Sequence, residues 1–343
     1  MKKPFVSILI PAFNAQDSIA ETLRSAISQT WELKEIIVVD DGSTDETLTI
    51  ARQFESKFLR VVTQKNQGAA AARNTAYSLS RGDYIQWLDA DDLLSRNKIA
   101  SQIHYALSHG ATEHTLLSCP WGYFIHRPQR AQFIATPLWC ELSPVEWLLR
   151  KMEHGVYMQT AVWLVSRNLT ESAGPWNTQL SVDDDGEYFC RVLIASSGTL
   201  FVPKAKVYYR RQGSSSLSYV GRSNRKMEDL FLSVKLHIGY VRSLEDNTRV
   251  RAACLKFLQY SLFFFYPERP DIVEKVRELA AELGGQLSVP GLSWKYVWIQ
   301  RVFGWPIVKR TKIILPQCKW ALIRSLDKTL SLIDKQRLEH YAQ

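Results

Sequence analysis

The first 95 residues alternate short apolar runs with stretches of helical periodicity, and no other feature constrains the fold as strongly. Four runs rich in β-branched residues begin 30, 24 and 25 residues apart: FVSILI (5–10), EIIVV (35–39), LRVVT (59–63) and YIQWL (84–88). Apolar residues recur at helical spacing in the first two gaps, and the third gap is rich in alanine. This alternation predicts an α/β fold with a mostly parallel central sheet flanked by helices.

Two capping-box patterns mark the expected starts of the first helices. Ser18 precedes Glu21 by three residues, and Ser43 precedes Glu46 in the same way. A serine at this position accepts a hydrogen bond from the first helical turn. We therefore expect helices to begin directly after Ser18 and Ser43.

Each apolar run is followed by polar or glycine-bearing residues. These segments read PAFN (11–14), DDGSTD (40–45), QKNQG (64–68) and DADD (89–92). In open α/β sheets, ligands bind beyond the carboxyl ends of the strands. The four segments should therefore meet at one edge of the sheet and form a binding site.

The last of these segments places Asp89, Asp91 and Asp92 within four positions after an apolar run. Like charges this close destabilise one another unless a cation is bound or one carboxyl group stays protonated. The alternative is a solvated turn in which an aspartate caps a helix that begins near Leu93. These residues alone leave both interpretations open, and in either case Asp92 is the expected cap.

Composition narrows the class of protein. With 46% hydrophobic and 22% charged residues over 343 positions, the chain has the composition of an ordinary folded protein. Its five cysteines are scattered and form no CxxC pair, which argues against a disulfide framework or a zinc site and favours a reducing, cytoplasmic location. We find no uncharged apolar window of 18 residues, and Pro11 interrupts the N-terminal apolar run, so we expect neither a transmembrane helix nor a signal peptide.

The positive charge lies in the C-terminal part of the chain. Residues 1–215 carry 22 Lys and Arg against 22 Asp and Glu, whereas residues 216–343 carry 21 against 12. Within 290–328, eight basic residues and four tryptophans accompany a single acidic residue. This tail suits peripheral contact with an anionic membrane, at the inner face of the cell membrane. Nucleic-acid binding uses the same residue types but is not expected, and a helical subdomain that packs its tryptophans on the core remains an alternative.

The segments SILIPAFN, VVDDGSTDET, NQGAAAARN and WLDADDLL, in this order and spacing, closely resemble the nucleotide-sugar domain of family 2 glycosyltransferases, nucleotide-diphospho-sugar transferases of the GT-A fold. The resemblance is strong over 5–95 and weaker to about 216. It implies a GT-A domain with a nucleotide-sugar-binding half (1–105), an acceptor-binding half (106–218) and a basic helical C-terminal extension (219–343). The implied donor is a nucleotide sugar, with a UDP-sugar expected before a GDP- or dTDP-sugar.

The resemblance also implies roles for individual residues. The expected nucleotide-sugar-binding residues are Pro11, Ala12, Asn14, Asp40, Asp41, Arg73 and Asp89. Asp40 would accept a hydrogen bond from the base, Asp41 would support the turn or the ribose, and Arg73 would lie near the diphosphate. Asp89 and Asp91 form the family's DxD pattern, in which the second aspartate binds the divalent cation (Mn²⁺ or Mg²⁺) directly. The first contacts the ribose, or the metal through water.

A second acidic segment, SVDDDGEYFCR (181–191), supplies the candidate base. The family has an acidic pair about six residues before an arginine, and counting back from Arg191 reaches Asp184 and Asp185. We expect Asp185 to take the acceptor proton, with Asp184 as its alternate. Asp183 is an additional acid, so the register is open by one residue, and an exposed acidic turn before a helix is the alternative.

The resemblance implies an inverting, metal-dependent transfer of a sugar to a saccharide or lipid-linked acceptor in polysaccharide or glycolipid biosynthesis. Gln212 stands where a metal-binding histidine often closes the family's domain, so a metal role there is doubtful, and Arg210 and Arg211 are candidate phosphate contacts or a solvated loop. A non-catalytic sugar-nucleotide-binding or scaffold protein is the alternative. A haloacid-dehalogenase-like phosphatase fits less well, because Leu93 stands where that chemistry needs Thr or Val.

Overall fold

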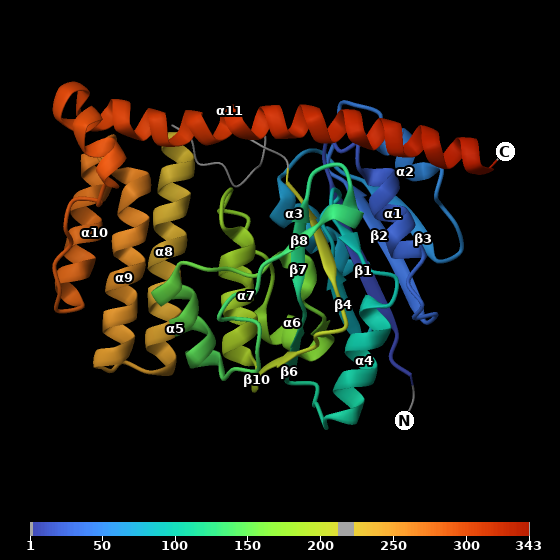
Figure 1. The fold of residues 1–343 in the computed structure, drawn as a ribbon. Helices are drawn as coiled ribbons and strands as arrows, with labels where there is room; N and C mark the ends of the chain where they lie inside the picture. Colours follow the sequence, from blue (N-terminus) through green and yellow to red (C-terminus); the bar gives the residue numbers. More distant parts are fainter. Residues whose placement is uncertain (1–2, 212–222, 343) are drawn as a thin grey trace.

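The computed structural model describes residues 3–211 and 223–342, without the side chains of 295, 313, 316–319, 332 and 335–342. An α/β region extends to residue 210, and four helices follow it (Figure 1). Gln212, the doubtful metal ligand, lies outside the described residues.

A five-stranded sheet in the order β3-β2-β1-β4-β9 forms the centre of the α/β region (Figure 1). Strands β1 to β4 are parallel, and β9 joins the edge in the antiparallel direction. The strands are β1 (Val6–Ala12), β2 (Lys34–Asp40), β3 (Leu59–Thr63), β4 (Tyr84–Trp87) and β9 (Val165–Ser166). The predicted parallel sheet is confirmed. Strand β1 is buried along its whole length, as expected for a parallel sheet covered on both faces.

The helices α1 to α3 connect the parallel strands and span Ile19–Ile27, Thr47–Arg52 and Ala69–Ser78. Helix α1 begins directly after Ser18, as predicted, although the Ser18 side chain makes no capping hydrogen bond to it. The predicted start after Ser43 is wrong. Helix α2 begins at Thr47, three residues after the predicted first residue, and the backbone N–H of Thr47 donates to Asp45 Oδ1 (3.0 Å).

Residues 93–210 add two small sheets beside the central one. One pairs β6 with β10, and the other is a mixed sheet in the order β5-β11-β7-β8. The strands are β5 (Leu93–Leu94), β6 (Thr115–Ser118), β7 (Trp121–Phe124), β8 (Gln132–Phe133), β10 (Gly198–Phe201) and β11 (Val207–Arg210). The helical elements are α4 (Lys98–Ser108), η1 (Pro128–Arg130), α5 (Pro144–His154), η2 (Thr160–Val162), α6 (Arg167–Ala173) and α7 (Asp184–Ala195). Because β11 pairs with β5, the last strand of this region returns to the segment that follows β4.

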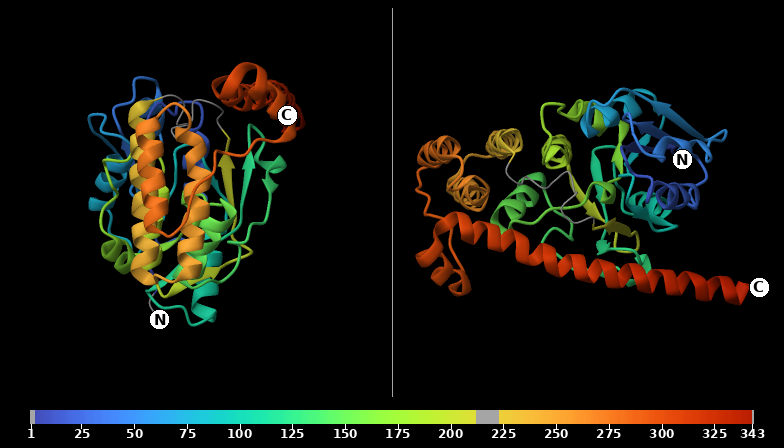
Figure 2. Two further views of the ribbon diagram at one scale, coloured as in Figure 1. Left: turned by 90° about the vertical axis from the view of Figure 1, so that its left-hand side faces the viewer. Right: turned by 90° about the horizontal axis from the view of Figure 1, so that it is seen from above.

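The predicted C-terminal helical extension is present. Helices α8 (Asn224–Leu244), α9 (Thr248–Phe265) and α10 (Pro270–Glu282) stand together at one end of the molecule (Figures 1 and 2). Helix α11 (Trp294–Ala342) is interrupted at Gly304, where the backbone φ is 74°. From there it runs along one side of the molecule past the mixed sheet (Figures 1 and 2).

The tryptophans of the tail do not all pack on the core. Trp305 is buried and Trp320 is partly buried, but Trp294 and Trp298 are 79% and 58% exposed. The alternative in which the tail packs its tryptophans on the core therefore describes only two of the four.

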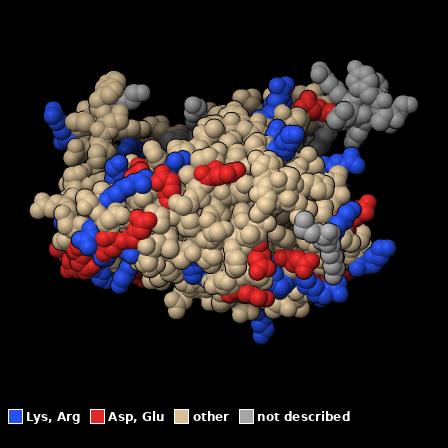
Figure 3. Space-filling model, turned by 90° about the horizontal axis from the view of Figure 1, so that it is seen from below, with Lys and Arg blue, Asp and Glu red and all other residues tan. Residues whose placement is uncertain are grey.

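On the face opposite α11, acidic and basic side chains lie beside one another (Figure 3).

Candidate functional site

The loops after β1 and β2 are joined to each other at the carboxyl edge of the sheet. Asn14 has a positive φ of 47°, and its backbone N–H donates to Ser43 Oγ (3.0 Å). Its side-chain Oδ1 accepts from the backbone N–H of Thr44 (2.9 Å). Pro11 and Ala12 lie just before this loop and are buried at the end of β1. The structure therefore brings the PAFN and DDGSTD segments together, as the strand order predicts.

The adjacent aspartates at the end of β2 have different environments. Asp41 accepts hydrogen bonds from Gln64 Nε2 (2.7 Å) and from the backbone N–H of Gly68 (2.8 Å), so its carboxylate holds the loop that leads into α3. Asp40 is 1% exposed, and its Oδ2 accepts from the backbone N–H of Ser43 (3.2 Å). Its other oxygen is buried and, within the described residues, has no hydrogen-bond partner. A buried acceptor without a partner is costly and is a position at which a ligand can bind.

The first acidic cluster (Asp89, Asp91, Asp92) follows β4. Its members differ in burial, because Asp92 is fully buried whereas Asp89 and Asp91 are partly exposed. The carboxylate of Asp92 accepts from the backbone N–H of Arg210 (2.8 Å) and from Gln159 Nε2. Strand β5 follows, and α4 begins only at Lys98, so the predicted helix-capping role of Asp92 is wrong. Asp92 instead connects the end of β4 with β11 and the loop before η2.

The second acidic cluster (Asp183, Asp184, Asp185) begins α7. Asp183 adopts a left-handed conformation (φ 55°) before the helix, and its carboxylate accepts from Ser233 Oγ in α8. The carboxylate of Asp185 accepts from Thr160 Oγ1 (3.3 Å) and from the backbone N–H of Gly186 (2.8 Å). Burial, with the nearby charges of Asp184 and Asp183, raises the pKa of Asp185 to about 7. A carboxyl group with this pKa can accept a proton near neutral pH.

Arg73 joins the two clusters. Its guanidinium donates to Asp89 Oδ1 (2.8 Å) and to Asp184 Oδ2 (2.7 Å), and it lies 4.3 Å from the ring centre of Trp176. Burial lowers the pKa of Arg73, but the charges of Asp89 and Asp184 outweigh that effect and raise it. Arg73 is thus shared by two carboxylates that lie 95 residues apart in the chain.

An aromatic cluster beneath Arg73 brings the two acidic clusters together. Trp176 stacks on Tyr188 with ring centres 4.0 Å apart, and Trp87 meets both rings edge-on, at 5.2 and 5.8 Å. Trp87 lies two residues before Asp89, and Tyr188 lies one turn into α7. Packing of these rings therefore fixes the start of α7 against the end of β4.

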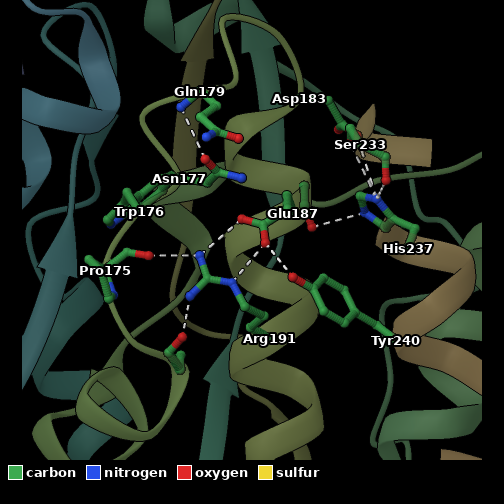
Figure 4. A network of polar contacts seen from close by, with 12 residues as sticks. Pro175, Trp176, Asn177, Gln179, Asp183, Glu187, Arg191, Ser233, His237 and Tyr240 are labelled. Carbon is green, nitrogen blue, oxygen red and sulfur yellow. Dashed lines mark hydrogen bonds and ion pairs between the residues drawn. The ribbon is translucent and has the colours of Figure 1, made fainter. Parts of the chain in front are cut away.

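The start of α7 is also held from the side of α8 (Figure 4). Arg191 makes a bidentate ion pair with buried Glu187 (2.8 and 2.9 Å), which also accepts from Tyr240 (2.7 Å). His237 is fully buried, within 3.0 Å of the Gly186 carbonyl and 2.8 Å of Lys151 Nζ. Arg191 is therefore a structural residue of α7, and these contacts orient the helix that carries Asp184 and Asp185.

Arg210 closes the site from the opposite side. Its Nε donates to the backbone carbonyl of Asp91 (2.8 Å), and its Nη2 pairs with Glu21 (2.6 Å). The structure thus uses Arg210 to hold the first acidic cluster rather than leaving it in a solvated loop. Gln159 and Thr160, which contribute to the same site, carry no motif, and Glu21 belongs only to a capping-box pattern. Their places in the site follow from the tertiary fold alone.

The donor set of the first acidic cluster fits a divalent cation. Asp89 and Asp91 offer hard carboxylate oxygens two residues apart, and such oxygens are preferred by Mn²⁺ and Mg²⁺. Over the described ranges, no group of three or more His, Cys, Asp or Glu side chains converges as a metal site. Two carboxylates leave coordination positions for diphosphate oxygens and water, so the residues fit a cation that is shared with a bound nucleotide.

Comparison with known sequences defines the class of protein. Residues 7–120 match the sequence profile of the family described as glycosyl transferase family 2. Over these residues the chain is therefore similar to family 2 glycosyltransferases, as the four strand-end segments predict.

Particular relatives support the same class. Over 137 residues the chain is 36% identical to the putative teichuronic acid biosynthesis glycosyltransferase TuaG of Bacillus subtilis, covering 37% of this chain and 54% of TuaG. Over 103 residues it is 45% identical to WfaP of Escherichia coli, a UDP-Glc:alpha-D-GlcNAc-diphosphoundecaprenol beta-1,3-glucosyltransferase, covering 29% and 40%. The chain thus spans about half or less of the length of these relatives.

Solved structures confirm the GT-A fold over most of the chain. Residues 1–349 of S. aureus TarS in complex with UDP superpose with a TM-score of 0.60 at 15% identity, covering 90% of this chain and 91% of that one. The mannosyltransferase PcManGT of Pyrobaculum calidifontis, in complex with GDP-Man and Mn²⁺, superposes with a TM-score of 0.52 at 16% identity, covering 96% and 89%. At these identities the likeness shows the fold alone.

Proposed function

We propose that this protein is an inverting, metal-dependent glycosyltransferase that moves a sugar from a nucleotide-diphosphate sugar to a hydroxyl group. The observation that carries the proposal is the meeting of the two acidic clusters on Arg73, at the carboxyl edge of a family 2 glycosyltransferase sheet. The phosphatase alternative loses support from this family match. A scaffold protein has no need to maintain both clusters, so we favour catalysis.

The donor would bind over the loops after β1 and β2. The unpartnered oxygen of Asp40 suits an N–H donor such as that of a nucleobase, and Asp41 already holds the loop that would line the ribose. Asn14, Pro11 and Ala12 form the neighbouring edge. TarS and PcManGT were solved with UDP and with GDP-Man, so either kind of donor fits the fold, and we propose a UDP-sugar first.

Asp91, with Asp89 beside it, would hold the divalent cation. A cation bound there supplies positive charge near the departing nucleoside diphosphate. Arg73 is buried between Asp89 and Asp184, so we assign it the orientation of both carboxylates in addition to a contact near the diphosphate. It thereby connects the donor side of the site with the acceptor side.

Asp185 would remove the proton of the attacking hydroxyl group. Its pKa of about 7 allows it to be ionised at neutral pH and still basic enough to accept a proton. Because one displacement at the anomeric carbon needs no protein nucleophile, the product would have inverted configuration. Asp184, bonded to Arg73, would be the alternate base only if that ion pair opened.

Release of nucleoside diphosphate tests this proposal directly. The full-length protein is incubated with UDP-, GDP- and dTDP-sugars, with Mn²⁺ or Mg²⁺, and the released diphosphate is measured. We expect release with one nucleotide class, lost on chelation and lowered by Asp91→Ala but not by Glu274→Ala, an exposed carboxylate on α10. Release that is unaffected by both chelation and Asp91→Ala would reject the metal role.

We also propose that α11 contacts an anionic membrane, which suits a lipid-linked acceptor. Its outward face exposes Leu322, Leu326 and Leu330 by 69%, 66% and 44%, and Arg310 and Lys328 are exposed on the same helix. No helix among the described residues is long and apolar enough to span a bilayer. An exposed apolar stripe with basic residues suits the bilayer surface.

Flotation with vesicles tests the membrane contact. We expect the full chain to bind phosphatidylcholine vesicles that contain phosphatidylglycerol, and to bind less as salt is raised. The double variant Leu322→Gln, Leu326→Gln should bind the vesicles roughly tenfold less tightly, because each substitution removes apolar side-chain area that would be buried in the bilayer. Leu107→Gln, at a 48% exposed leucine on α4, is the matched control. Equal binding by the double variant and the control would reject this role for α11.

A further inference from the structure

An aromatic shelf lies beside the proposed base and has no role in the mechanism above. It consists of Trp121 in β7, Tyr209 in β11 and Tyr157 in the loop between α5 and η2. The ring centre of Trp121 is 5.4 Å from that of Tyr157 and 5.8 Å from that of Tyr209. Tyr157 is 53% exposed, so its ring is available to a ligand.

The loop that carries Tyr157 contacts both acidic clusters. Two residues after Tyr157, Gln159 bonds to Asp92, and the next residue, Thr160, donates to Asp185 (3.3 Å). Partial burial raises the pKa of the Tyr157 phenol, and the charge of Asp185 raises it further, which is consistent with their proximity. The aromatic shelf is therefore adjacent to the atom that would accept the acceptor's proton.

Strand alternation places the aromatic shelf on the side of β11 away from the Arg210 side chain. In β11, Arg210 bonds to the first acidic cluster, and its guanidinium lies over Phe124 of β7. Tyr209 in β11 and Arg211 directly after it lie on the other side, since Tyr209 meets Trp121 and the guanidinium of Arg211 lies over Tyr123. The aromatic shelf still faces the acidic clusters, because burial raises the pKa of the Tyr209 phenol and the nearby charges of Asp92, Asp91 and Asp89 raise it further.

Arg211 adds a positive charge to the aromatic face. Its side chain is exposed, and its guanidinium carbon lies 3.8 Å from the ring centre of Trp320 in α11 and 5.7 Å from that of Tyr123. Its backbone N–H donates to the Phe124 carbonyl (2.8 Å), which fixes its position after β11. Among the residues that the structure describes, no carboxylate lies within ion-pair distance of this guanidinium. The charge is therefore oriented by two rings and available to an anion.

We propose that this surface is the acceptor site, and that the acceptor is a pyranose attached to a phosphate or diphosphate. The C–H face of a pyranose is apolar, so an aromatic ring covers it while the hydroxyl groups stay free to hydrogen-bond. Stacking on Tyr157 and Trp121 would hold one hydroxyl group near Asp185. Arg211 would meet the phosphate, since a guanidinium matches phosphate oxygens in charge and geometry.

This inference rests on the proposed function and names its acceptor class. It also gives α11 a second contact with the site, because Trp320 of that helix positions Arg211. A phosphate at Arg211 would therefore lie where the membrane-facing helix meets the mixed sheet. The phosphate could belong to a lipid-linked sugar or to a free sugar phosphate, and the experiment separates the two sources.

The test measures acceptor binding by calorimetry on the full chain, with UDP present to occupy the donor side. The probes are octyl hexopyranosyl diphosphates, the corresponding free hexose 1-phosphates, and octyl hexopyranosides that lack phosphate. The variants are Tyr157→Ala and Arg211→Ala, with Phe264→Ala and Arg52→Ala as matched exposed controls on α9 and α2. UDP binding by each variant reports whether the fold and donor site are intact.

We expect Tyr157→Ala to weaken every probe roughly threefold to tenfold, and Arg211→Ala to weaken only the phosphorylated probes, by roughly tenfold. Tyr157→Phe should keep the affinity of the wild type. Stronger binding of octyl diphosphates than of free 1-phosphates identifies a lipid-linked source, and equal binding a free sugar phosphate. Unchanged probe affinity in both alanine variants, with UDP still bound, overturns the acceptor site alone. Absence of binding of UDP, GDP and dTDP by the wild type overturns the proposed function instead.

Discussion

The two acidic clusters contain the same number of aspartates, but the fold distributes their members differently. In each cluster, one carboxylate bonds to Arg73 and another is tied to the surrounding structure. The third is the one to which we assign chemistry. In the first cluster, Asp89 bonds to Arg73, Asp91 is the proposed metal ligand and Asp92 is the structural acid. In the second cluster, Asp183 is the structural acid, Asp184 bonds to Arg73 and Asp185 is the proposed base.

The reason for the difference lies in the elements that carry them. The first cluster follows a strand, so sheet register sets where each side chain points. The second begins a helix, and the left-handed Asp183 turns its own side chain towards α8 before the helix starts. Gly186 makes this possible, because a Cβ at that position would lie 2.1 Å from Asp183 Oδ1. Equal composition therefore says little about which acid is chemically active.

Replacement of the two acids assigned to chemistry should have the largest effects and should distinguish the clusters. We expect Asp91→Ala and Asp185→Asn each to lower the rate of transfer by about 10² to 10³-fold. Because Asp91, and not Asp185, is assigned to the metal, raised Mn²⁺ should restore part of the activity of Asp91→Ala and none of that of Asp185→Asn. Initial rates over a Mn²⁺ titration measure both effects.

Nucleotide binding by each variant is the control for folding. Transfer by Asp185→Asn at the rate of the wild type would remove the proposed base. Identical metal dependence in the two variants would remove the distinction between a metal-binding cluster and a proton-accepting cluster.

The pH dependence should report the second cluster rather than the first. Only ionised Asp185 accepts a proton, and its pKa is about 7. The rate constant kcat/KM should therefore rise about tenfold per pH unit well below pH 7 and level off above it. Profiles measured from pH 5.5 to 9 at saturating metal test this. A profile that stays flat through pH 7 would contradict assignment of the base to Asp185.

The arrangement at the sheet edge could be predicted from the sequence because it depends on local signals. Four strand ends with polar residues lead to one edge in any parallel sheet, so Asp40, Asp41 and Asp89 were correctly expected there. The role of Asp92 could not be predicted in this way. Its partners, Arg210 and Gln159, come from segments 118 and 67 residues away that meet it only in the tertiary fold.

The bridge through Arg73 also lay beyond local patterns. It requires α7 to pack against the end of β4, and this packing depends on Trp87, Trp176 and Tyr188, which carry no motif. The start of α2 shows the same limit on a smaller scale. The capping-box pattern at Ser43 predicts a helix start, but Ser43 instead bonds to the loop after β1.

Arg73→Lys should weaken the connection between the clusters without removing either. A lysine keeps one positive charge but cannot donate in two fixed directions to Asp89 and Asp184. We expect transfer to fall roughly tenfold to 100-fold. The pH profile should also move upward, because the charge of Arg73 lowers the pKa of Asp185, and a lysine without the two fixed contacts holds its charge less closely to that carboxyl group. Lower activity with an unmoved profile would indicate that Arg73 acts on the donor side only.

Asp183→Asn should have the smallest effect, and it decides the register of the second cluster. Asparagine tolerates the left-handed conformation and can still accept from Ser233, so we expect the free energy of unfolding to change by less than about 1 kcal/mol. Transfer should stay within about threefold of the wild type, and the pH midpoint should fall, since the charge of Asp183 raises the pKa of Asp185. The comparison with Asp185→Asn is closely matched, because the same atoms change two residues apart. If Asp183→Asn instead abolished transfer in a stable protein, the base would lie at Asp183, and the structural and chemical roles within this cluster would be exchanged.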